Sequence, residues 1–290
     1  MREINELVAK VDISIAKERL DKVLSKLFPE ISRRKSRVLI DKGSVYLNGK
    51  RCLISSKIVN QGDTLKLVLD KEDEEKKIEE ISILYEDENF IALNKPPFLP
   101  SIPTKTDIKS ALHFVSRMKN TGLKDIHIVN RLDTPVSGVV LFALSKDSAR
   151  FIENLKEKNE IEKIYLAIVK GEIEKKEGSI EIPLKFTGNY AFPSDSGKKS
   201  VTKYEVLKTS KAFSLLKIVP LTGRMHQIRV HLKEIGFPIV GDRKYGDKPF
   251  LSQMPLLHCF KMVFIDKNGK KIEIEGKPFK EFEKFQKKFL

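Results

Sequence analysis

A run of charged residues at positions 69–80, LDKEDEEKKIEE, divides the chain into two parts. Ten of its twelve residues are Asp, Glu or Lys, and its two apolar residues show no periodicity. Such a segment buries too little apolar surface to offset the entropy cost of ordering it. We therefore expect an exposed linker over residues 69–80, a small domain over residues 1–68 and a larger domain over residues 81–290.

The small domain is predicted to contain two helices followed by a hairpin. Apolar residues at helical spacing indicate the first helix: Leu20, Val23, Leu24 and Leu27. Pro29 would end this helix, Ser32 is placed to cap a second one, and Gly43 would end the second. The next segment, SVYLNGKRC, is typical of a hairpin that turns at Asn48-Gly49. These elements describe a small α/β module.

The second predicted helix carries a cluster of positive charge, formed by Arg33, Arg34, Lys35 and Arg37. No acidic residue lies between them, so the cluster lacks the local ion pairs of an ordinary solvated helix face, which is the alternative interpretation. The whole chain has 55 Lys and Arg against 40 Asp and Glu, a net charge of +15. Such an excess favours a polyanionic partner, because neutralising phosphates releases counterions. We predict that the cluster binds nucleic acid.

The cysteines and the apolar segments indicate a cellular compartment. Cys52 and Cys259 lie far apart and form no CxxC, so they fit neither a disulfide framework nor a cysteine-based metal site. The first residues, MREINELVAKVDI, lack the apolar core of a signal peptide. No stretch approaches the roughly 20 apolar residues needed to cross a bilayer. We expect a soluble cytoplasmic protein that contacts no membrane.

Beyond residue 81, short β-like runs alternate with helices. The runs are FIALNK, VVLFAL, YLAIVKGEI, VTKYEVLK, FSLLKIVPL, MVFI and KIEIEG. Several are separated by turns too short for a parallel crossover, so neighbouring strands must often be antiparallel. These features predict an α+β domain with a central mixed, largely antiparallel β-sheet flanked by helices.

The segment LTGRMHQIRVHLKEIG, residues 221–236, opens with Gly223-Arg224 and leads into a helix. One apolar face of that helix is formed by Met225, Ile228, Leu232 and Ile235, and Gly236 would end it. His226 and His231 are five residues apart, so they do not share one face as the histidines of HExxH do. The sequence also contains no GxSxG, Walker or GxGxxG motif. Metal hydrolysis, serine hydrolysis and nucleotide-driven chemistry are therefore poorly supported.

Three residues remain as candidates for chemistry. Asp133 lies in the turn NRLDTPVSG between two apolar runs, and Tyr165 lies in an otherwise apolar strand. Arg224 is placed to pair with Asp133 and hold it ionised, because burial without a cation favours the neutral carboxyl. A purely structural ion pair would produce the same pattern, so the residues alone leave both interpretations open.

The motifs resemble two known families. NRLDTPVSGVVLFALSK, EKIYLAIVKG and GRMHQIRVHLKEIGFPIVGDRKYG resemble the signatures of the RluA family of pseudouridine synthases, as do NKPP and LLHCFKMVF. This likeness spans about residues 81–285. Residues 17–66 resemble the RNA-binding domain first recognised in the small-subunit ribosomal protein S4. Three positions depart from the RluA signature: Asn130 replaces His, Pro135 replaces Asp and Val136 replaces Thr.

The resemblance implies that the protein isomerises uridine to pseudouridine in RNA, without a metal or other cofactor. It assigns Asp133 as the catalytic acid, Arg224 as its pairing partner, and Tyr165 as the ring that stacks on the base and assists proton removal at carbon 5. The small Ser137-Gly138 pair would let the backbone approach the RNA. Further RNA contacts are expected from Arg131, which would enter the space left by the flipped uridine, and from His226, Gln227 and Arg229.

The RNA itself is not specified by these residues. By analogy with the family, the small N-terminal domain favours structured large-subunit ribosomal RNA over transfer RNA, which remains possible, and a monomer is expected. One alternative is a non-catalytic RNA-binding or ribosome-assembly factor with the same basic module. Another is an enzyme acting on a small carbohydrate or nucleotide, which would have little need for residues 1–68.

Overall fold

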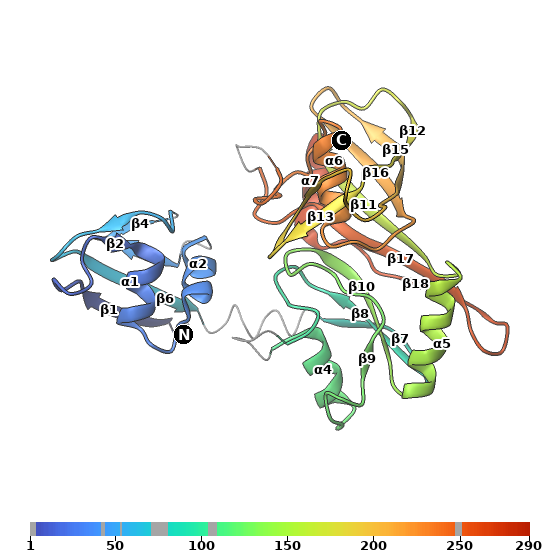
Figure 1. Ribbon diagram of the computed structural model, residues 1–290, viewed down its shortest axis with the longest axis horizontal. Coiled ribbons are helices and arrows are strands. Elements are labelled where there is room, and N and C mark those ends of the chain that lie inside the picture. The colour runs from blue at the N-terminus through green and yellow to red at the C-terminus, as the bar shows by residue number, and fades with distance from the viewer. Residues whose placement is uncertain (1–3, 42–43, 53, 71–80, 104–108, 247–250) are drawn as a thin grey trace. The chain divides into compact units, whose positions relative to one another are not determined.

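The computed structural model describes residues 4–41, 44–52, 54–70, 81–103, 109–246 and 251–290. The chain divides into two compact units, with the boundary between residues 79 and 80 (Figure 1). Most of the predicted linker lies outside the described residues, but strand β6 extends through Asp70 and so includes its first two positions.

The described residues of the first unit form a four-stranded antiparallel sheet in the order β1-β6-β3-β4, two helices and a short β2-β5 pair. The strands are β1 (Ile4–Lys10), β2 (Glu18–Arg19), β3 (Val45–Leu47), β4 (Lys50–Arg51), β5 (Ile58–Val59) and β6 (Thr64–Asp70). Helix α1 spans Leu20–Leu27 and helix α2 spans Arg33–Asp41. Leu20, Val23 and Leu24 are fully buried, which confirms the predicted apolar face.

The local signals of the first unit act as expected. Helix α1 ends before Pro29, and the Ser32 hydroxyl caps α2 by accepting from the amide of Lys35 at 3.2 Å. The hairpin turns at Asn48-Gly49, where both residues have positive φ, 51° and 74°. A two-residue turn of this conformation matches the twist of the flanking strands. The predicted helix end at Gly43 lies outside the described residues.

The second unit is built on a ten-stranded sheet, whose main path runs β12-β15-β16-β11-β17-β10-β8-β7. Its strands are β7 (Ser82–Glu86), β8 (Phe90–Lys95), β9 (His127–Ile128), β10 (Ser137–Ala143), β11 (Glu162–Lys170), β12 (Glu177–Ile180), β15 (Thr202–Thr209), β16 (Phe213–Pro220), β17 (Leu257–Ile265) and β18 (Lys271–Glu275). A separate hairpin joins β13 (Leu184–Thr187) to β14 (Tyr190–Pro193). The helices are α4 (Ala111–Met118), α5 (Lys146–Glu157), α6 (Gln227–Glu234) and α7 (Lys280–Phe289).

Among the described pairings of this sheet, β10 with β17 is parallel and the others are antiparallel. The predicted α+β class with a mixed, largely antiparallel sheet is therefore confirmed. Successive residues of β11 point to opposite faces, as a strand requires. Ala167 joins the main core, whereas Ile168 packs with Phe282 of α7.

The parallel contact explains the small residues after the predicted turn. Gly138 has φ +118°, and a Cβ there would lie 2.2 Å from the carbonyl oxygen of Cys259. Ser137 is buried, and its hydroxyl bonds to His258 Nδ1 at 2.9 Å. These two residues therefore serve the junction of β10 and β17, and not the approach of RNA that was predicted. Glycine suits a position where two backbones approach this closely, because it has no Cβ.

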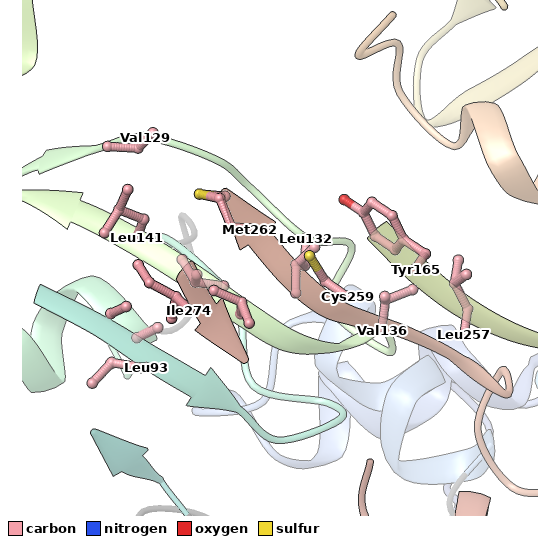
Figure 2. Close-up of a cluster of buried hydrophobic side chains, with 14 of the residues drawn as sticks. Leu93, Val129, Leu132, Val136, Leu141, Tyr165, Leu257, Cys259, Met262 and Ile274 are labelled. Atoms are coloured by element: carbon pink, nitrogen blue, oxygen red, sulfur yellow. The ribbon is translucent and has the colours of Figure 1, made fainter. Parts of the chain in front are cut away.

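The main core lies around β8, β10, β11 and β17, and Figure 2 draws part of it, with side chains from these strands, from β18 and from the segment between β9 and β10. Tyr165 belongs to this cluster and lies beside Cys259 (Figure 2). Ile152 of α5 and Leu232 of α6 complete it from the helices. Within the described residues, no helix is both long and apolar enough to span a membrane.

Candidate active site

Asp133 lies in the loop that joins β9 to β10. The predicted turn is present, because the carbonyl of Asp133 accepts from the amide of Val136 at 2.9 Å. The side chain of Asp133 is 24% exposed, and its neighbour Arg131 is exposed. The loop therefore holds the Asp133 carboxylate in a half-buried position next to the buried strand β10, with the exposed Arg131 close to it in sequence.

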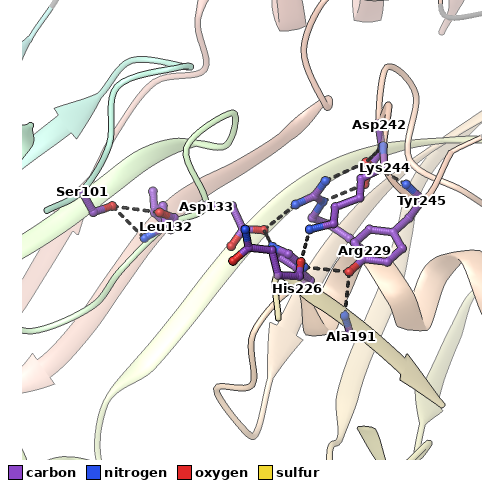
Figure 3. Close-up of polar contacts among 10 residues, drawn as sticks. Ser101, Leu132, Asp133, Ala191, His226, Arg229, Asp242, Lys244 and Tyr245 are labelled. Carbon is purple, nitrogen blue, oxygen red and sulfur yellow. Dashed lines mark hydrogen bonds and ion pairs between the residues drawn. The ribbon is translucent and has the colours of Figure 1, made fainter. Parts of the chain in front are cut away.

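Arg229, and not Arg224, is the partner of Asp133. Its Nη1 atom donates to Asp133 Oδ2 at 2.7 Å, while Nε and Nη2 donate to the two oxygens of Asp242, both at 2.7 Å (Figure 3). The side chains of Arg229 and Asp242 are 5% and 1% exposed. A guanidinium fork held by one buried carboxylate is a rigid donor to a second.

The charges within this trio support one another. Burial opposes the charge of Arg229, but Asp242 and Asp133 outweigh it and raise the pKa of Arg229 above its usual value. Burial likewise acts to raise the pKa of Asp242, and Arg229 together with the amides of Lys244 and Tyr245 lowers it overall. Asp242 therefore stays ionised, and it holds Arg229 in place.

The prediction that Arg224 pairs with Asp133 is wrong for a geometric reason. Helix α6 begins at Gln227, so Arg224 lies in the preceding turn. It is exposed, and its Nε donates to the carbonyl of Lys199 at 3.3 Å. Arg229 follows Met225 by four residues and precedes Leu232 by three, so it falls on the apolar face of the helix. That spacing was visible in the sequence.

Gln227 was predicted to bind RNA, and the structure contradicts this. Its side chain is 3% exposed. Its Oε1 accepts from Thr222 Oγ1 and the Arg224 amide, and its Nε2 donates to the carbonyl of Val201 and to Thr202 Oγ1. All its hydrogen-bonding capacity is used inside the protein, so Gln227 fixes the entry to α6. Arg229 was also predicted to bind RNA. Its guanidinium instead forms buried ion pairs with Asp133 and Asp242, and these three residues make up the acid cluster.

His226 lies between the acid cluster and the β13-β14 hairpin. Its Nδ1 is 2.7 Å from the hydroxyl of Tyr245, which accepts from the amide of Ala191, and its Nε2 is 3.7 Å from Asp133 Oδ2 (Figure 3). Burial lowers the pKa of His226 to about 4, although the charge of Asp133 opposes the shift. The imidazole is therefore neutral near pH 7. Its RNA contact stays a prediction.

Tyr165 is on β11, opposite Cys259 of β17, and is 9% exposed. Burial raises the pKa of its phenol well above 10, and Cys259 and the charge of Asp133 add to the shift. The hydroxyl is therefore protonated in the resting protein. Tyr165 offers a flat ring near the carboxylate, while its participation in proton removal stays a prediction.

Lys95 and Asn130 brace the loop, a role that the sequence did not indicate for either residue. Lys95 is fully buried, and its ammonium group donates to the carbonyls of Pro96, Leu99 and Thr134 at 3.0, 2.8 and 3.2 Å. Burial lowers the pKa of Lys95 to about 7, against the effect of Asp133. Asn130, one of the departures from the family signature, accepts from the Leu141 amide and donates to the Val139 carbonyl, both at 2.9 Å. Its amide thus takes the place of a peptide group beside β10.

In the first unit, the basic cluster has an acidic partner that was not predicted. Arg33 and Arg37 donate to Asp21 Oδ2 at 3.2 and 2.6 Å, and Arg19 donates to Oδ1 at 3.0 Å. Burial acts to raise the pKa of Asp21, but the three arginines lower it to about 2. The acid comes from α1, so local spacing on α2 did not reveal it.

The basic cluster nevertheless remains at the surface. Arg33 and Arg37 are 44% and 49% exposed. Arg34 and Lys35 are exposed and make no ion pair within the described part of the chain. In the same part of the chain, no group of three or more His, Cys, Asp or Glu side chains is arranged to hold a metal ion.

Comparison with known proteins places both units in families. Residues 89–234 match the RNA pseudouridylate synthase family, and residues 18–65 match the S4 domain. Ribosomal large subunit pseudouridine synthase C of Rickettsia bellii is 31% identical over 93% of this chain and 97% of that protein. tRNA pseudouridine synthase C of Haemophilus ducreyi is 36% identical over 58% of this chain and 75% of that protein.

A solved structure shares the fold of the larger unit. Human RNA pseudouridylate synthase domain containing 1 superposes with a TM-score of 0.60 at 23% identity, over 69% of this chain and 84% of that chain. The matched family segment contains Asp133, Tyr165 and Arg229, the residues that the structure brings together, and ends before Asp242. The resemblance inferred from the sequence motifs is therefore confirmed.

Proposed function

Because this chain belongs to the RNA pseudouridylate synthase family and carries an S4 domain, we propose that it isomerises specific uridines of structured large-subunit ribosomal RNA, with Asp133 as the catalytic residue. The chain is an RNA pseudouridine synthase by family. The choice of RNA and the role of Asp133 are the proposal.

The observation that carries the role of Asp133 is the unequal use of its two oxygens. Oδ2 accepts from Arg229 at 2.7 Å and faces His226, whereas Oδ1 accepts no hydrogen bond within the described residues. Isomerisation needs an ionised carboxylate with one oxygen free, whether that oxygen attacks the sugar, attacks the base or removes a proton. The hydrogen bond from Arg229 fixes the orientation of the carboxylate, and Oδ1 is left for the substrate.

Two further residues support a flipped nucleotide as the substrate. An enzyme cannot reach a base inside a helix, so the uridine must leave its stack first. The ring of Tyr165 is a surface on which uracil would stack close to Asp133. Arg131, exposed two residues before the acid, would fill the vacated space, since a guanidinium both stacks and donates hydrogen bonds.

The choice of ribosomal RNA rests on the extent of the chain that is matched. The relative named for the large ribosomal subunit aligns with 93% of the chain, an extent that requires both units. The relative named for transfer RNA aligns with 58% of the chain. This extent is too short to include both the second unit and the S4 domain in full. The S4 domain and its basic helix would add affinity for a large structured RNA. We further propose that the protein acts as a monomer in the cytoplasm.

Release of the carbon-5 hydrogen tests the proposal. We expect the purified protein to release label from ribosomal RNA that carries tritium at carbon 5 of uridine, isolated from a strain lacking the gene, in the presence of chelator. Sequencing of pseudouridines in ribosomal and transfer RNA from the same strain identifies the target. No release from ribosomal RNA, together with no loss of pseudouridine from either RNA in the strain, would refute the enzyme assignment and favour the non-catalytic factor. Loss of pseudouridine from transfer RNA alone would refute the choice of substrate.

A further inference from the structure

The hydroxyl of Ser101 bonds to both backbone polar groups of Leu132, the residue that precedes Asp133. Its Oγ donates to the carbonyl of Leu132 at 2.9 Å and accepts from the amide of Leu132 at 3.0 Å (Figure 3). Ser101 is 4% exposed and Leu132 is 7% exposed, so water does not offer an equal substitute. One hydroxyl therefore does what a neighbouring strand residue does in a sheet, where an opposite residue both donates and accepts.

The loop depends on such side-chain contacts because it has no strand partner at this point. Strand β9 ends at Ile128, which pairs with Phe142 of β10, and β10 itself begins only at Ser137. Between those positions the backbone of Leu132 is bonded to Ser101, as described above. A rotation of the Leu132 peptide would move the backbone of Asp133 and displace its carboxylate from Arg229.

Ser101 is itself fixed by a helix terminus. Its carbonyl accepts from the amide of Leu112 at 3.1 Å, and the carbonyl of Pro100 accepts from the amide of Ala111 at 2.9 Å. These are the first amides of α4, which have no partner inside the helix. The main core contains Ala111 and Val115, so α4 is anchored in it. The helix therefore supplies a rigid support for the Ser101 hydroxyl.

We propose that Ser101 is a positioning residue for Asp133: its hydroxyl fixes the Leu132 peptide, and through it the carboxylate, in the geometry that the reaction needs. This inference rests on the proposed function of Asp133. Ser101 is buried beneath the loop, so it does not contact RNA. Its loss should slow the chemical step and leave RNA affinity unchanged.

The test is the variant Ser101→Ala, with Ser116→Ala as the matched control. Ser116 is also buried, at 7% exposure, and its hydroxyl donates to the carbonyl of Thr121 at the other end of α4. Each substitution removes one buried hydroxyl and the hydrogen bond that it donates to a carbonyl, and Ser101→Ala also leaves the Leu132 amide without its acceptor. The measurement is the single-turnover release of tritium from carbon 5 of uridine in ribosomal RNA, with the enzyme in saturating excess, together with RNA affinity.

The expected result is a rate constant about 10-fold to 100-fold lower for Ser101→Ala, because a misplacement of about 1 Å costs on the order of 10²-fold. RNA affinity should stay within about 2-fold, and Ser116→Ala should keep the wild-type rate constant within about 2-fold. Saturating enzyme makes the rate constant that of the bound complex, so a partly unfolded sample does not lower it.

Other outcomes separate the positioning role of Ser101 from the proposed function. A wild-type rate constant in Ser101→Ala, or an equal fall in Ser116→Ala, would overturn the positioning role while the proposed function stands. A fall in RNA affinity that accounts for the whole loss of activity would also overturn it. If the wild-type protein released no label, the proposed function would fail and the inference would fail with it.

Discussion

Replacement of Arg229 by Met removes the cation that joins Asp133 to Asp242. Asp242 is 1% exposed, and among the described residues it keeps, without Arg229, the amides of Lys244 and Tyr245 as hydrogen-bond donors, at 2.9 and 3.1 Å. Asp133 loses its 2.7 Å bond. Methionine retains much of the side-chain volume, so the perturbation is chiefly electrostatic. The matched control is Arg224→Met, which removes an exposed arginine from the same turn and helix region.

The cost of Arg229→Met follows from burial. Removing one partner of a buried ion pair destabilises a protein by about 3–5 kcal/mol, because the other charge is left uncompensated. For a unit of more than 150 residues, each kcal/mol lowers the melting temperature by about 2–4 °C, so a fall of about 6–20 °C is expected. A charged hydrogen bond contributes about 1.5–3 kcal/mol, so the turnover of folded protein should fall by about 10-fold to 150-fold.

Differential scanning calorimetry and single-turnover tritium release measure these two effects. Arg224→Met should change the free energy of unfolding by less than about 0.5 kcal/mol, as surface substitutions usually do. It should leave the rate constant near that of the wild type, and any effect should fall on RNA affinity. Equal stability and rate for Arg229→Met, or losses of this size for Arg224→Met, would refute the assignment of Arg229 as the partner of Asp133.

Lys95 has a pKa of about 7 in the folded protein against its ordinary 10.5, so between these pH values the unfolded chain binds more protons than the folded one. The free energy of unfolding should therefore rise with pH in this window in the wild type, relative to Lys95→Met. Equal pH dependence of the urea midpoints of the two proteins would contradict this. Gln227→Ala should lower the melting temperature while RNA affinity stays within about 2-fold, since its amide is fully used inside the protein, and weaker RNA binding at unchanged stability would restore it as an RNA contact. Neutralising Arg34 and Lys35 together should reduce the log–log salt slope of RNA binding by about 1.4, from about 0.7 per phosphate contact, and an unchanged slope in filter binding would exclude the basic helix from RNA docking.

The strands and the fold class could be predicted from the sequence because their signals are local. FIALNK is β8 to the residue, and VVLFAL overlaps β10 from Val139 to Ala143. FIAL and VVLFAL are continuous apolar runs, as expected for a strand buried on both faces. The turn at Asn48-Gly49 and the cap at Ser32 depend on residues at fixed short offsets. In such places the sequence alone specifies the structure.

The site was harder to predict because its contacts join distant residues. Two arginines lie five positions apart in GRMHQIR, and the choice between them depends on where α6 begins. Asp21 reaches Arg37 across 16 residues, and Ser101 reaches Leu132 across 31. No periodicity connects such positions. Asp133 itself was identified through the family signature, since a buried ion pair alone does not separate a catalytic acid from a structural one.

Asp133→Asn tests the central claim most directly, because it keeps the size and polarity of the side chain and removes the negative charge. Asp147→Asn is the matched control, since Asp147 is 82% exposed at the start of α5. The measurement is tritium release from carbon 5 of uridine in ribosomal RNA at saturating enzyme, together with RNA affinity. We predict that Asp133→Asn releases no label while binding RNA within about 3-fold of the wild type, and that Asp147→Asn is fully active. Release by Asp133→Asn at a rate near that of the wild type would contradict the assignment of Asp133 as the catalytic residue.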